Sequence, residues 1–393
     1  MVDVAVKSGQ KISIVFIITG LSLGGAEMML YKVLSRLDRK QFDPVVVSLK
    51  CKGTLGDRIS DLGIPVRTMG MKPGVPTLAS TWRLIRTVRE LNPDLIQGWM
   101  YHGNLAAQLA VTVAPHPVPV IWNIRHSLHS LDSEKAGTAA IIKLLAKLSS
   151  YPAQILYNSK TSAIQHEELG YKAGKTRIIP NGFDTDLFTP STEARNSLRT
   201  ELSIAENIFL IGLMGRYHAV KDHANFLKAA AILLETYSDI HFVLAGREIS
   251  RENIALQDFI ETWGLTERIH LLGERPDMPH ITAALHIASS SSYSEAFPNV
   301  IGEAMSCGVP CVVTDVGDSA WIVGDTGRVV PPRDPQALAN AWKELIDLGS
   351  MGRERLGHLA RTRIIEHFSL DSVVAQYEAL YESLLAWQLN RRN

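Results

Sequence analysis

Cysteine is scarce in this chain, which has only Cys51, Cys307 and Cys311 among its 393 residues. Three widely spaced thiols exclude a disulfide framework and a four-ligand zinc site, and they favour a reducing environment. Long apolar runs are missing as well, because the strongest, residues 12–18, is far shorter than the roughly 20 residues of a spanning helix. The first residues, MVDVAVKSGQK, lack the apolar core of a signal peptide. We therefore expect a cytoplasmic chain that does not cross a membrane.

The chain has no net charge, because 40 Lys and Arg balance 40 Asp and Glu. A zero total argues against a protein that coats nucleic acid. The two halves nevertheless differ: residues 1–180 contain 22 basic and 12 acidic side chains, and residues 181–393 contain 18 and 28. The halves thus carry +10 and −10. A basic half fits an anionic surface or a phosphorylated ligand, and it motivates the hypothesis of peripheral association with an anionic membrane.

Hydrophobic residues make up 46% of the chain, and its length predicts two or three domains with sizeable cores. Short, continuously apolar runs alternate with longer amphipathic stretches, which is typical of parallel sheets covered by helices on both faces. In the first half the predicted strands are 12–19, 44–49, 65–69, 95–99, 118–123, 155–158 and 177–180, and the predicted helices include 26–37, 78–91 and 104–113.

A polar stretch at 190–207 interrupts this pattern before a second series begins. Its predicted strands are 208–214, 241–245, 269–272, 285–289 and 311–314, with helices at 222–237, 253–263 and 299–307. The fold class is therefore α/β, with two Rossmann-like, doubly wound domains at 1–185 and 186–368 and a ligand cleft at the carboxyl ends of their strands. The remaining segment, 369–393, has helical apolar spacing and can pack back on the first domain.

The first predicted strand leads through Gly24 and Gly25 into a helix. Glycines let a ligand approach a helix N-terminus, whose amides favour anions. The alternative is an ordinary turn between strand and helix. The spacing is not G-x-G-x-x-G, which weakens the hypothesis of a dinucleotide cofactor.

At the corresponding turn of the second domain, Arg216 and Lys221 follow the strand at 208–214. Two cations at a strand end can converge on one anion, and a planar guanidinium together with an ammonium suits a diphosphate. The alternative is a pair of solvated surface charges.

The segment 294–310 holds two carboxylates, Glu295 and Glu303, around a helix predicted to start at Pro298. Glu295 precedes this helix and can face a ligand. Glu303 lies inside its apolar body and can reach a ribose hydroxyl pair, the alternative being a buried salt bridge. The amides at the start of this helix form a second phosphate seat, at Phe297, Asn299 and Val300.

The order and joint spacing of these motifs resemble the retaining glycosyltransferases of family 4, which have the GT-B fold and make bacterial polysaccharides and glycolipids. The resemblance covers nearly the whole chain. It rests on the pairing of Arg216 and Lys221 with Glu295-x7-Glu303, and on the segments 24–27, 180–184, 308–310 and 327–332.

The resemblance implies that Arg216 and Lys221 neutralise the donor diphosphate as it leaves. It also implies that Glu295 acts as a catalytic group on the donor sugar, that Glu303 holds the nucleotide ribose, and that the backbone at Gly25 approaches the donor phosphates or the acceptor. Transfer with retained anomeric configuration is implied too. No metal or other cofactor is expected, since the cations and helix termini stabilise the leaving group.

Two histidines and an arginine follow predicted strands of the first domain. His126 resembles the family's histidine that contacts the donor sugar, so we expect it to be catalytic. We expect His102, Arg125 and Gly24 to contact the acceptor or the donor. The alternative for either histidine is a structural role, capping a helix or bonding to the backbone.

Two further segments each have a functional and a structural interpretation. Residues 184–186 have the D-x-D spacing of a metal-binding motif, but they follow a predicted hinge and we interpret them as a structural turn. Residues 135–147 form a basic amphipathic stretch that can lie on an anionic membrane or pack as an ordinary crossover helix.

We therefore predict a retaining, metal-independent glycosyltransferase, in which the second domain binds a nucleotide-sugar and the first binds the acceptor. UDP is favoured over GDP, and a lipid-linked or growing oligo- or polysaccharide at the inner face of the cell membrane is the expected acceptor. One alternative is a nucleotide-sugar epimerase of the same fold, which needs no acceptor. The other is a non-catalytic paralogue that binds nucleotide-sugars.

Overall fold

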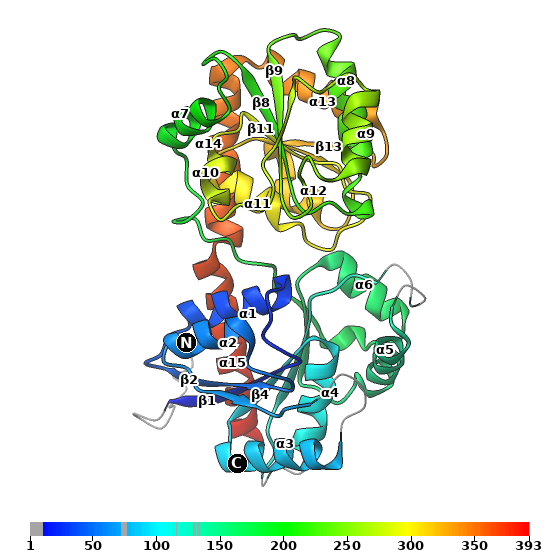
Figure 1. Cartoon of the computed structure of the whole chain (residues 1–393). Helices are drawn as coiled ribbons and strands as arrows, with labels where there is room; N and C mark the ends of the chain where they lie inside the picture. Colours follow the sequence, from blue (N-terminus) through cyan, green and yellow to red (C-terminus); the bar gives the residue numbers. More distant parts are fainter. Residues whose placement is uncertain are drawn as a thin grey trace. The chain divides into compact units, whose positions relative to one another are not determined.

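The computed structural model describes residues 11–71, 77–112, 114, 116–128, 131 and 134–392, the side chains of 387–392 excepted. The chain divides into two compact units, one made of Met1–Gly182 and Val373–Asn393 and the other of Phe183–Ser372. This division falls a few residues before the boundary expected after residue 185. Each unit contains one parallel sheet flanked by helices (Figure 1).

In the described part of the first unit, seven parallel strands form a sheet in the order β3-β2-β1-β4-β5-β6-β7. The strand order reverses between β1 and β4, so the chain leaves these two neighbours toward opposite faces of the sheet. The strands are β1 (Ile12–Ile18), β2 (Phe42–Ser48), β3 (Val66–Thr68), β4 (Leu95–Trp99), β5 (Val120–Ile124), β6 (Gln154–Tyr157) and β7 (Thr176–Ile178).

Helices cover both faces of this sheet because its strands are apolar on both sides. One face, which carries Val15 and Ile17, packs against α3, α4 and α5. The opposite face carries Phe16. The helices within residues 11–182 are α1 (Gly25–Arg36), α2 (Gly53–Asp61), α3 (Leu78–Leu91), α4 (Met100–Val111), α5 (Ala136–Leu148), α6 (Lys160–Glu168) and the short η2 (Ala173–Lys175).

The C-terminal helix α15 (Leu370–Arg392) packs on the first unit, in agreement with the prediction for 369–393. The buried ring of Tyr381 makes edge contacts with Phe16 and Phe42, at 6.4 and 5.8 Å between centroids. Its hydroxyl donates to Gln97 Oε1 over 2.6 Å. Among the described residues, neither α15 nor any other helix has the length and apolar character needed to cross a membrane.

The second unit repeats this design with its described strands in the order β10-β9-β8-β11-β12-β13, and the order reverses between β8 and β11. The strands are β8 (Phe209–Met214), β9 (Ile240–Ala245), β10 (Ile269–Leu271), β11 (Ile287–Ser290), β12 (Cys311–Thr314) and β13 (Arg328–Val330). The helices are α7 (Thr192–Glu201), η3 (Ala219–Lys221), α8 (His223–Leu234), α9 (Ile254–Thr262), α10 (Met278–Ala283), α11 (Asn299–Ser306), α12 (Ser319–Val323), η4 (Gly324–Thr326), α13 (Pro335–Asp347) and α14 (Gly349–Phe368).

The polar stretch at 190–207 is not merely an interruption, because it contains α7. Ser191 caps this helix, its hydroxyl accepting a hydrogen bond from the Ala194 amide over 3.1 Å. Ala194 and Leu198 are buried, while most of the helix surface is polar. The sparse apolar residues explain why composition alone hid this helix, although Ser191 is a signal for its start. The other predicted elements shift mainly at their ends, and α4 starts four residues earlier than the predicted 104.

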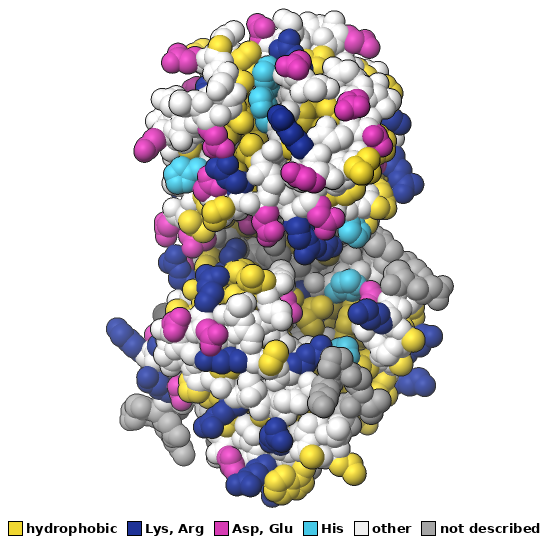
Figure 2. All heavy atoms as spheres, viewed as in Figure 1, with side chains coloured by type: hydrophobic (Ala, Val, Ile, Leu, Met, Phe, Trp, Pro, Cys, Tyr) yellow, Lys and Arg dark blue, Asp and Glu magenta, His cyan; other side chains and the backbone are white. Residues whose placement is uncertain are grey.

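The charge split follows the two units. The first unit has 24 Lys and Arg against 14 Asp and Glu, a net charge of +10, and the second has 16 against 26, a net charge of −10. On the face drawn in Figure 2, basic side chains predominate over the first unit and acidic side chains over the second.

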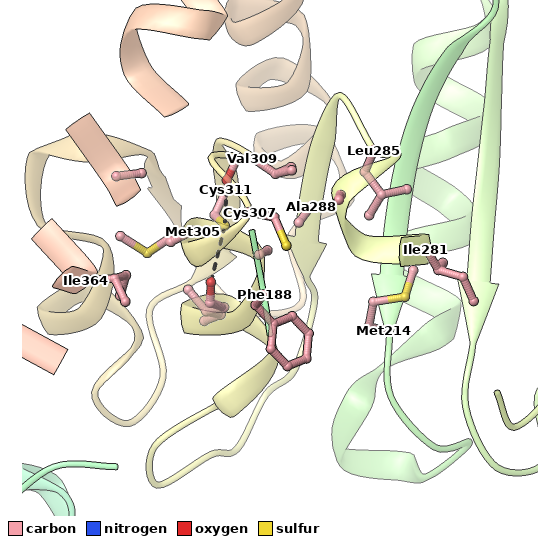
Figure 3. Close-up of a cluster of buried hydrophobic side chains, with 14 of the residues drawn as sticks. Phe188, Met214, Ile281, Leu285, Ala288, Met305, Cys307, Val309, Cys311 and Ile364 are labelled. Carbon is pink, nitrogen blue, oxygen red and sulfur yellow. Dashed lines mark hydrogen bonds between the residues drawn. The ribbon is translucent and has the colours of Figure 1, made fainter. Parts of the chain in front are cut away.

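The core of the second unit contains two of the three cysteines (Figure 3). All three are free thiols, Cys51 being exposed and the other two buried. Burial raises the pKa of Cys307 to about 12, so this thiol is protonated and unreactive at neutral pH. The thiol of Cys311 donates to the Val309 carbonyl oxygen over 3.5 Å. Cys307 and Cys311 are thus packing residues, and the free state of all three thiols agrees with the exclusion of disulfides.

Gly302 in α11 lies directly against the buried ring of Phe183, which stacks on Phe297. An added Cβ would overlap that ring. We expect Gly302→Ala to lower the free energy of unfolding by about 1–3 kcal/mol, because the ring must shift within a packed core. Urea denaturation measures the difference. Gly137→Ala in α5 is the matched helical control, since its added Cβ would meet no atom within 4 Å. Equal losses in both variants would contradict this account.

Candidate active site

The reversal of strand order between β8 and β11 brings together the loops 215–222 and 291–298. The first loop follows β8 and the second follows β11, so both leave the carboxyl edge of the sheet. The loop that follows β9 supports the first of these loops, because the Tyr217 amide donates to the Arg247 carbonyl oxygen over 2.8 Å. In doubly wound sheets this edge, at the point of reversal, is where ligands bind.

Lys221 and Glu295 form an ion pair at this edge. Lys221 Nζ donates to Glu295 Oε1 over 2.5 Å, and the side chains are only 19% and 15% exposed. Ser292 Oγ donates to the same carboxylate oxygen over 2.8 Å. The structure thus brings together two of the predicted site residues and adds Ser292, whose only signal in the sequence is its place in a serine run after β11.

Backbone contacts hold the two loops against each other. Ser291 Oγ donates to the carbonyl oxygens of Lys221 and Asp222, over 2.8 and 3.1 Å. The Tyr293 amide donates to the Val220 carbonyl oxygen over 2.9 Å. Asp222 adopts a left-handed conformation (φ 50°) and caps α8 with its side chain. The position of Lys221 is therefore set by the fold and does not depend on its ion pair alone.

Arg216 differs from Lys221 in its surroundings. It is exposed, and its side chain forms no hydrogen bond or ion pair with any residue that the structure describes. The Lys221 side chain packs beside Gly215, the residue before Arg216, since a Cβ added to Gly215 would lie 3.6 Å from Lys221 Cε. A hydrated guanidinium and a paired ammonium thus lie on the same loop, and both can donate to an anion.

The backbone of Glu295 is held from behind by the loop after β12. Gly317 has a left-handed backbone (φ 56°), and a side chain there would overlap the Glu295 carbonyl oxygen. The Asp318 amide donates to the Ala296 carbonyl oxygen over 2.9 Å. Only glycine allows this close approach, so Gly317 positions Glu295, a role that its sequence context did not reveal.

The predicted phosphate seat coincides with the start of α11. Pro298 at the N-cap has no side-chain acceptor, and Asn299 and Val300, in the first turn, are half-buried. The Phe297 ring is part of an aromatic cluster with Phe183 and other buried rings, so only its backbone can face a ligand. Contact between the amides of these residues and the phosphates of the nucleotide-sugar stays a prediction.

Glu303 lies further along α11 and is half-buried. Its charge, together with burial, raises the pKa of the adjacent Cys307 thiol. Glu303 lies on the same helix as the predicted phosphate seat, in the following turn. Its assignment to a nucleotide ribose stays a prediction.

In the first unit, α1 begins at Gly25, and Gly24 is its N-cap. Glu27 folds back over the helix start, since a Cβ at Gly24 would overlap its carboxylate, and burial raises the pKa of Glu27. A Cβ at Gly25 would meet no atom within 4 Å. Packing within this unit therefore does not require glycine at residue 25, which is consistent with space left for a ligand.

His126 follows β5, and its Nε2 lies 2.7 Å from Glu134 Oε1. The ring of Tyr101 makes an edge contact with His126 at 6.2 Å between centroids. His102, in the first turn of α4, is half-buried, and burial together with the charge of Lys50 lowers its pKa. Glu134 was not predicted, because nothing in its local sequence marks it as a partner of His126.

The Arg125 guanidinium points into the first unit. It donates through Nη1 to the Tyr377 hydroxyl over 3.0 Å and through Nη2 to Asn181 Oδ1, and it lies 5.3 Å from the centroid of the Trp99 ring. Asn123 Nδ2 donates to the same hydroxyl over 3.0 Å. Burial lowers the pKa of Arg125, while the contact with Tyr377 acts in the opposite direction. Arg125 thus holds α15 on the sheet, and its predicted contact with a substrate stays a prediction.

The D-x-D segment forms a turn, as its position in the sequence indicated. Asp184 Oδ1 accepts hydrogen bonds from the amides of Asp186 and Leu187, over 3.2 and 3.0 Å. Across the described residues, no group of three or more His, Cys, Asp or Glu side chains is arranged to hold a metal ion.

Two units that each contain a doubly wound parallel sheet have the architecture of the GT-B fold. A family model described as Glycosyltransferase Family 4 matches residues 23–187, and one described as Glycosyl transferases group 1 matches 208–347. The chain belongs to the family 4 glycosyltransferases.

Similar proteins include a D-inositol 3-phosphate glycosyltransferase of Corynebacterium urealyticum, 30% identical over 291 residues that make up 67% of either chain. The UDP-Gal:alpha-D-GlcNAc-diphosphoundecaprenol alpha-1,3-galactosyltransferase of Escherichia coli is 24% identical over 379 residues, 91% of this chain and 94% of that one. The fold is that of Anabaena Alr3699/HepE in complex with UDP, with a TM-score of 0.82 and 24% identity over 95% of this chain and all of that one.

Tyr377→Phe removes the hydroxyl that accepts from Arg125 and Asn123. We expect the free energy of unfolding to fall by about 1–3 kcal/mol, because two largely buried donors lose their acceptor. Urea unfolding followed by circular dichroism measures the loss. Tyr151→Phe, at an exposed ring, is the control and should stay within about 0.5 kcal/mol of the wild type. A Tyr377→Phe variant as stable as this control would show that the hydroxyl does not anchor α15.

His223 is buried in the first turn of α8, two residues after Lys221. Burial, together with the positive charge of Lys221, lowers the pKa of His223 to about 4. Between about pH 4 and pH 6.5 the folded chain binds fewer protons here than the unfolded chain, so stability falls as the pH is lowered through this window. We expect His223→Gln to reduce the slope of Tm against pH in that range. Thermal unfolding at several pH values tests this, with the exposed His367→Gln as control. An unchanged slope in the His223 variant would contradict the prediction.

Proposed function

We propose that this chain transfers a sugar from a UDP-sugar to a lipid-linked or growing oligo- or polysaccharide acceptor, with retained anomeric configuration and without a metal ion. The observation that carries the proposal is the Lys221–Glu295 ion pair beside the exposed Arg216, where the strand order reverses. UDP is supported by HepE, described in complexes with UDP and with UDP-glucose, and by the UDP-Gal donor in the name of the Escherichia coli relative. The diphosphoundecaprenol in that name supports a lipid-linked acceptor.

Arg216 and Lys221 are the groups for the donor diphosphate. The exposed guanidinium offers a planar fork, and the ammonium offers three donors on a flexible stem. Negative charge grows on the diphosphate as the bond to the sugar breaks. Positive groups already in place then lower the energy of the transition state, which is the part that a divalent cation plays in other glycosyltransferases.

Glu295 changes partner when the donor binds. Without the diphosphate its carboxylate compensates Lys221, and with the diphosphate bound Lys221 turns to the phosphates. Glu295, still held by Ser292 and by the backbone contact at Gly317, then accepts hydrogen bonds from hydroxyls of the donor sugar. Departure and attack on the same face of the sugar retain the anomeric configuration, and the carboxylate favours positive charge developing on the ring.

The remaining predicted roles complete the donor and acceptor sites. Glu303 holds the nucleotide ribose, and the amides at the start of α11 bind phosphate oxygens. Gly25 and His126 contact the donor or the acceptor. The first unit, with its net charge of +10, binds the acceptor at the inner face of the cell membrane, where anionic lipids attract basic side chains.

Glu295→Gln tests the central step. We expect the transfer rate to fall about 100- to 1,000-fold, because the charge facing the sugar is lost. The affinity for UDP should be kept or raised, because glutamine no longer competes with the diphosphate for Lys221. Turnover of a UDP-sugar with a lipid-linked acceptor gives the rate, and titration calorimetry gives the UDP affinity. Glu261→Gln, at an exposed position on α9, is the control.

Unchanged transfer by Glu295→Gln would overturn the role of Glu295, and a wild-type chain that does not bind UDP would overturn the choice of donor. The same assay with a chelator tests metal independence, and NMR of the product tests retention. Inversion of configuration at a sugar carbon in the absence of any acceptor would instead establish an epimerase, whereas simple hydrolysis of the donor would not.

A further inference from the structure

The outer face of α3 exposes large apolar side chains beside arginines. Leu78 is 92% exposed and Trp82, one turn further on, is 63% exposed. Arg83, Arg86 and Arg89 are exposed on the same helix. These five residues are here called the outer face of α3. Figure 2 shows apolar and basic side chains side by side at the end of the first unit where Figure 1 places α3.

The helix is well formed without a partner on this face. Ser80, Leu84 and Val88, spaced one turn apart, are its buried stripe, and the last two belong to the core of the first unit. Thr77 caps its start, its hydroxyl accepting from the Ser80 amide over 3.2 Å, and Asn92 ends it in a left-handed conformation. The stability of the fold therefore does not explain why Leu78 and Trp82 are apolar.

The arginines are available to an external anion. Arg86 lies 5.8 Å from the centroid of the Trp82 ring and forms an ion pair with Glu90 in which both side chains are more than 60% exposed. Such exposed pairs are weak and exchange readily for another anion. Arg83 donates through Nη1 to the Met69 carbonyl oxygen over 3.0 Å, and within the described part of the chain its other nitrogens form no hydrogen bond.

α5, the helix that the sequence marked as a basic amphipathic stretch, exposes fewer large apolar side chains than α3 does. Ile142 and Leu145 are buried in the core of the first unit, and Ile141 packs against it. The long exposed side chains of α5 are Lys143, Lys147 and Leu144, the last 43% exposed, and the other exposed residues of this helix are Ala136, Gly137 and Ala140. Of the large apolar residues that suggested a membrane contact, all but Leu144 thus pack inside the fold.

We propose that the outer face of α3 docks this chain on an anionic membrane surface. Tryptophan and leucine enter the zone between headgroups and acyl chains, while arginine binds lipid phosphates. The net charge of +10 on the first unit adds long-range attraction. One row of two apolar side chains is too small for a stable protein interface, which buries about 1,200 Å² or more. The inference rests on the membrane-linked acceptor of the proposed function.

Sedimentation with vesicles of phosphatidylcholine, with and without phosphatidylglycerol, tests the proposal. We expect the wild-type chain to pellet only with the anionic vesicles, and less so as salt is added. Replacing one arginine at such a surface lowers partitioning about fivefold, so Arg83→Gln/Arg86→Gln/Arg89→Gln should lower it about 100-fold. Leu78→Ser/Trp82→Ser should lower it through the apolar contribution, independently of charge.

Two control variants are matched to these changes. Lys143→Gln/Lys147→Gln removes charge from α5, and Trp263→Ser removes an exposed tryptophan of the second unit, whose ring lies 5.7 Å from Lys228 Nζ. Trp263→Ser should pellet like the wild type, and the α5 variant should lose only the small long-range contribution of two charges, far less than either α3 variant. Equal losses in the α5 and α3 variants would overturn the assignment, as would a wild-type chain that stays in the supernatant. Self-association that is lost on Trp82→Ser would assign the face to a second copy of the chain.

UDP binding by the same preparations separates this inference from the proposed function. None of the changed residues belongs to the donor site, so all variants should bind UDP like the wild type. UDP binding without pelleting would refute the membrane face and leave the donor site standing. Pelleting without UDP binding would refute the donor assignment and leave the membrane face standing.

Discussion

The reversal of strand order between β8 and β11 is the constraint on which the candidate active site depends. Because the chain leaves these neighbouring strands toward opposite faces, their loops meet at the carboxyl edge of the sheet with no crossover helix between them. Hydrogen bonds donated by the Ser291 hydroxyl and the Tyr293 amide then join the loops, so Lys221 Nζ and Glu295 Oε1 lie 2.5 Å apart although the two residues are 74 positions apart in the chain. The chemistry of the site follows from this topology before any ligand is considered.

Local charge at the site differs from that of the unit around it. The second unit carries −10, yet its ligand edge presents Arg216 and Lys221. The charges of these two cations are stabilised in different ways. Arg216 is exposed to water, while Lys221 is largely buried and its charge is compensated by Glu295. A largely buried ammonium without this partner would destabilise the fold. The carboxylate therefore stabilises the folded state when no donor is bound, and in the proposed mechanism it acts on the donor sugar once Lys221 turns to the diphosphate.

The sequence predicted the two parallel sheets, because continuously apolar strands and intervening helices leave few other folds. It also placed Arg216, Lys221 and Glu295 at strand ends, since each follows an apolar run closely. It could not predict the partners Ser292, Glu134 and Tyr377, because packing between distant segments decides which side chains meet. Periodicity likewise marked α5 as amphipathic, but it does not show whether apolar residues of a helix are buried or exposed. Most of those on α5 are buried, whereas Leu78 and Trp82 on α3 lie outside the buried stripe and are exposed.

The first unit consists of two separate pieces of chain, whereas the second is one continuous segment. The piece contributed by α15 covers Phe16 and supplies the hydroxyl that Arg125 contacts. Because synthesis proceeds from the N-terminus, Phe183–Ser372 leaves the ribosome before that helix does. The unit that is synthesised first is therefore completed after the second, because the part of its sheet around Phe16 stays uncovered until α15 emerges.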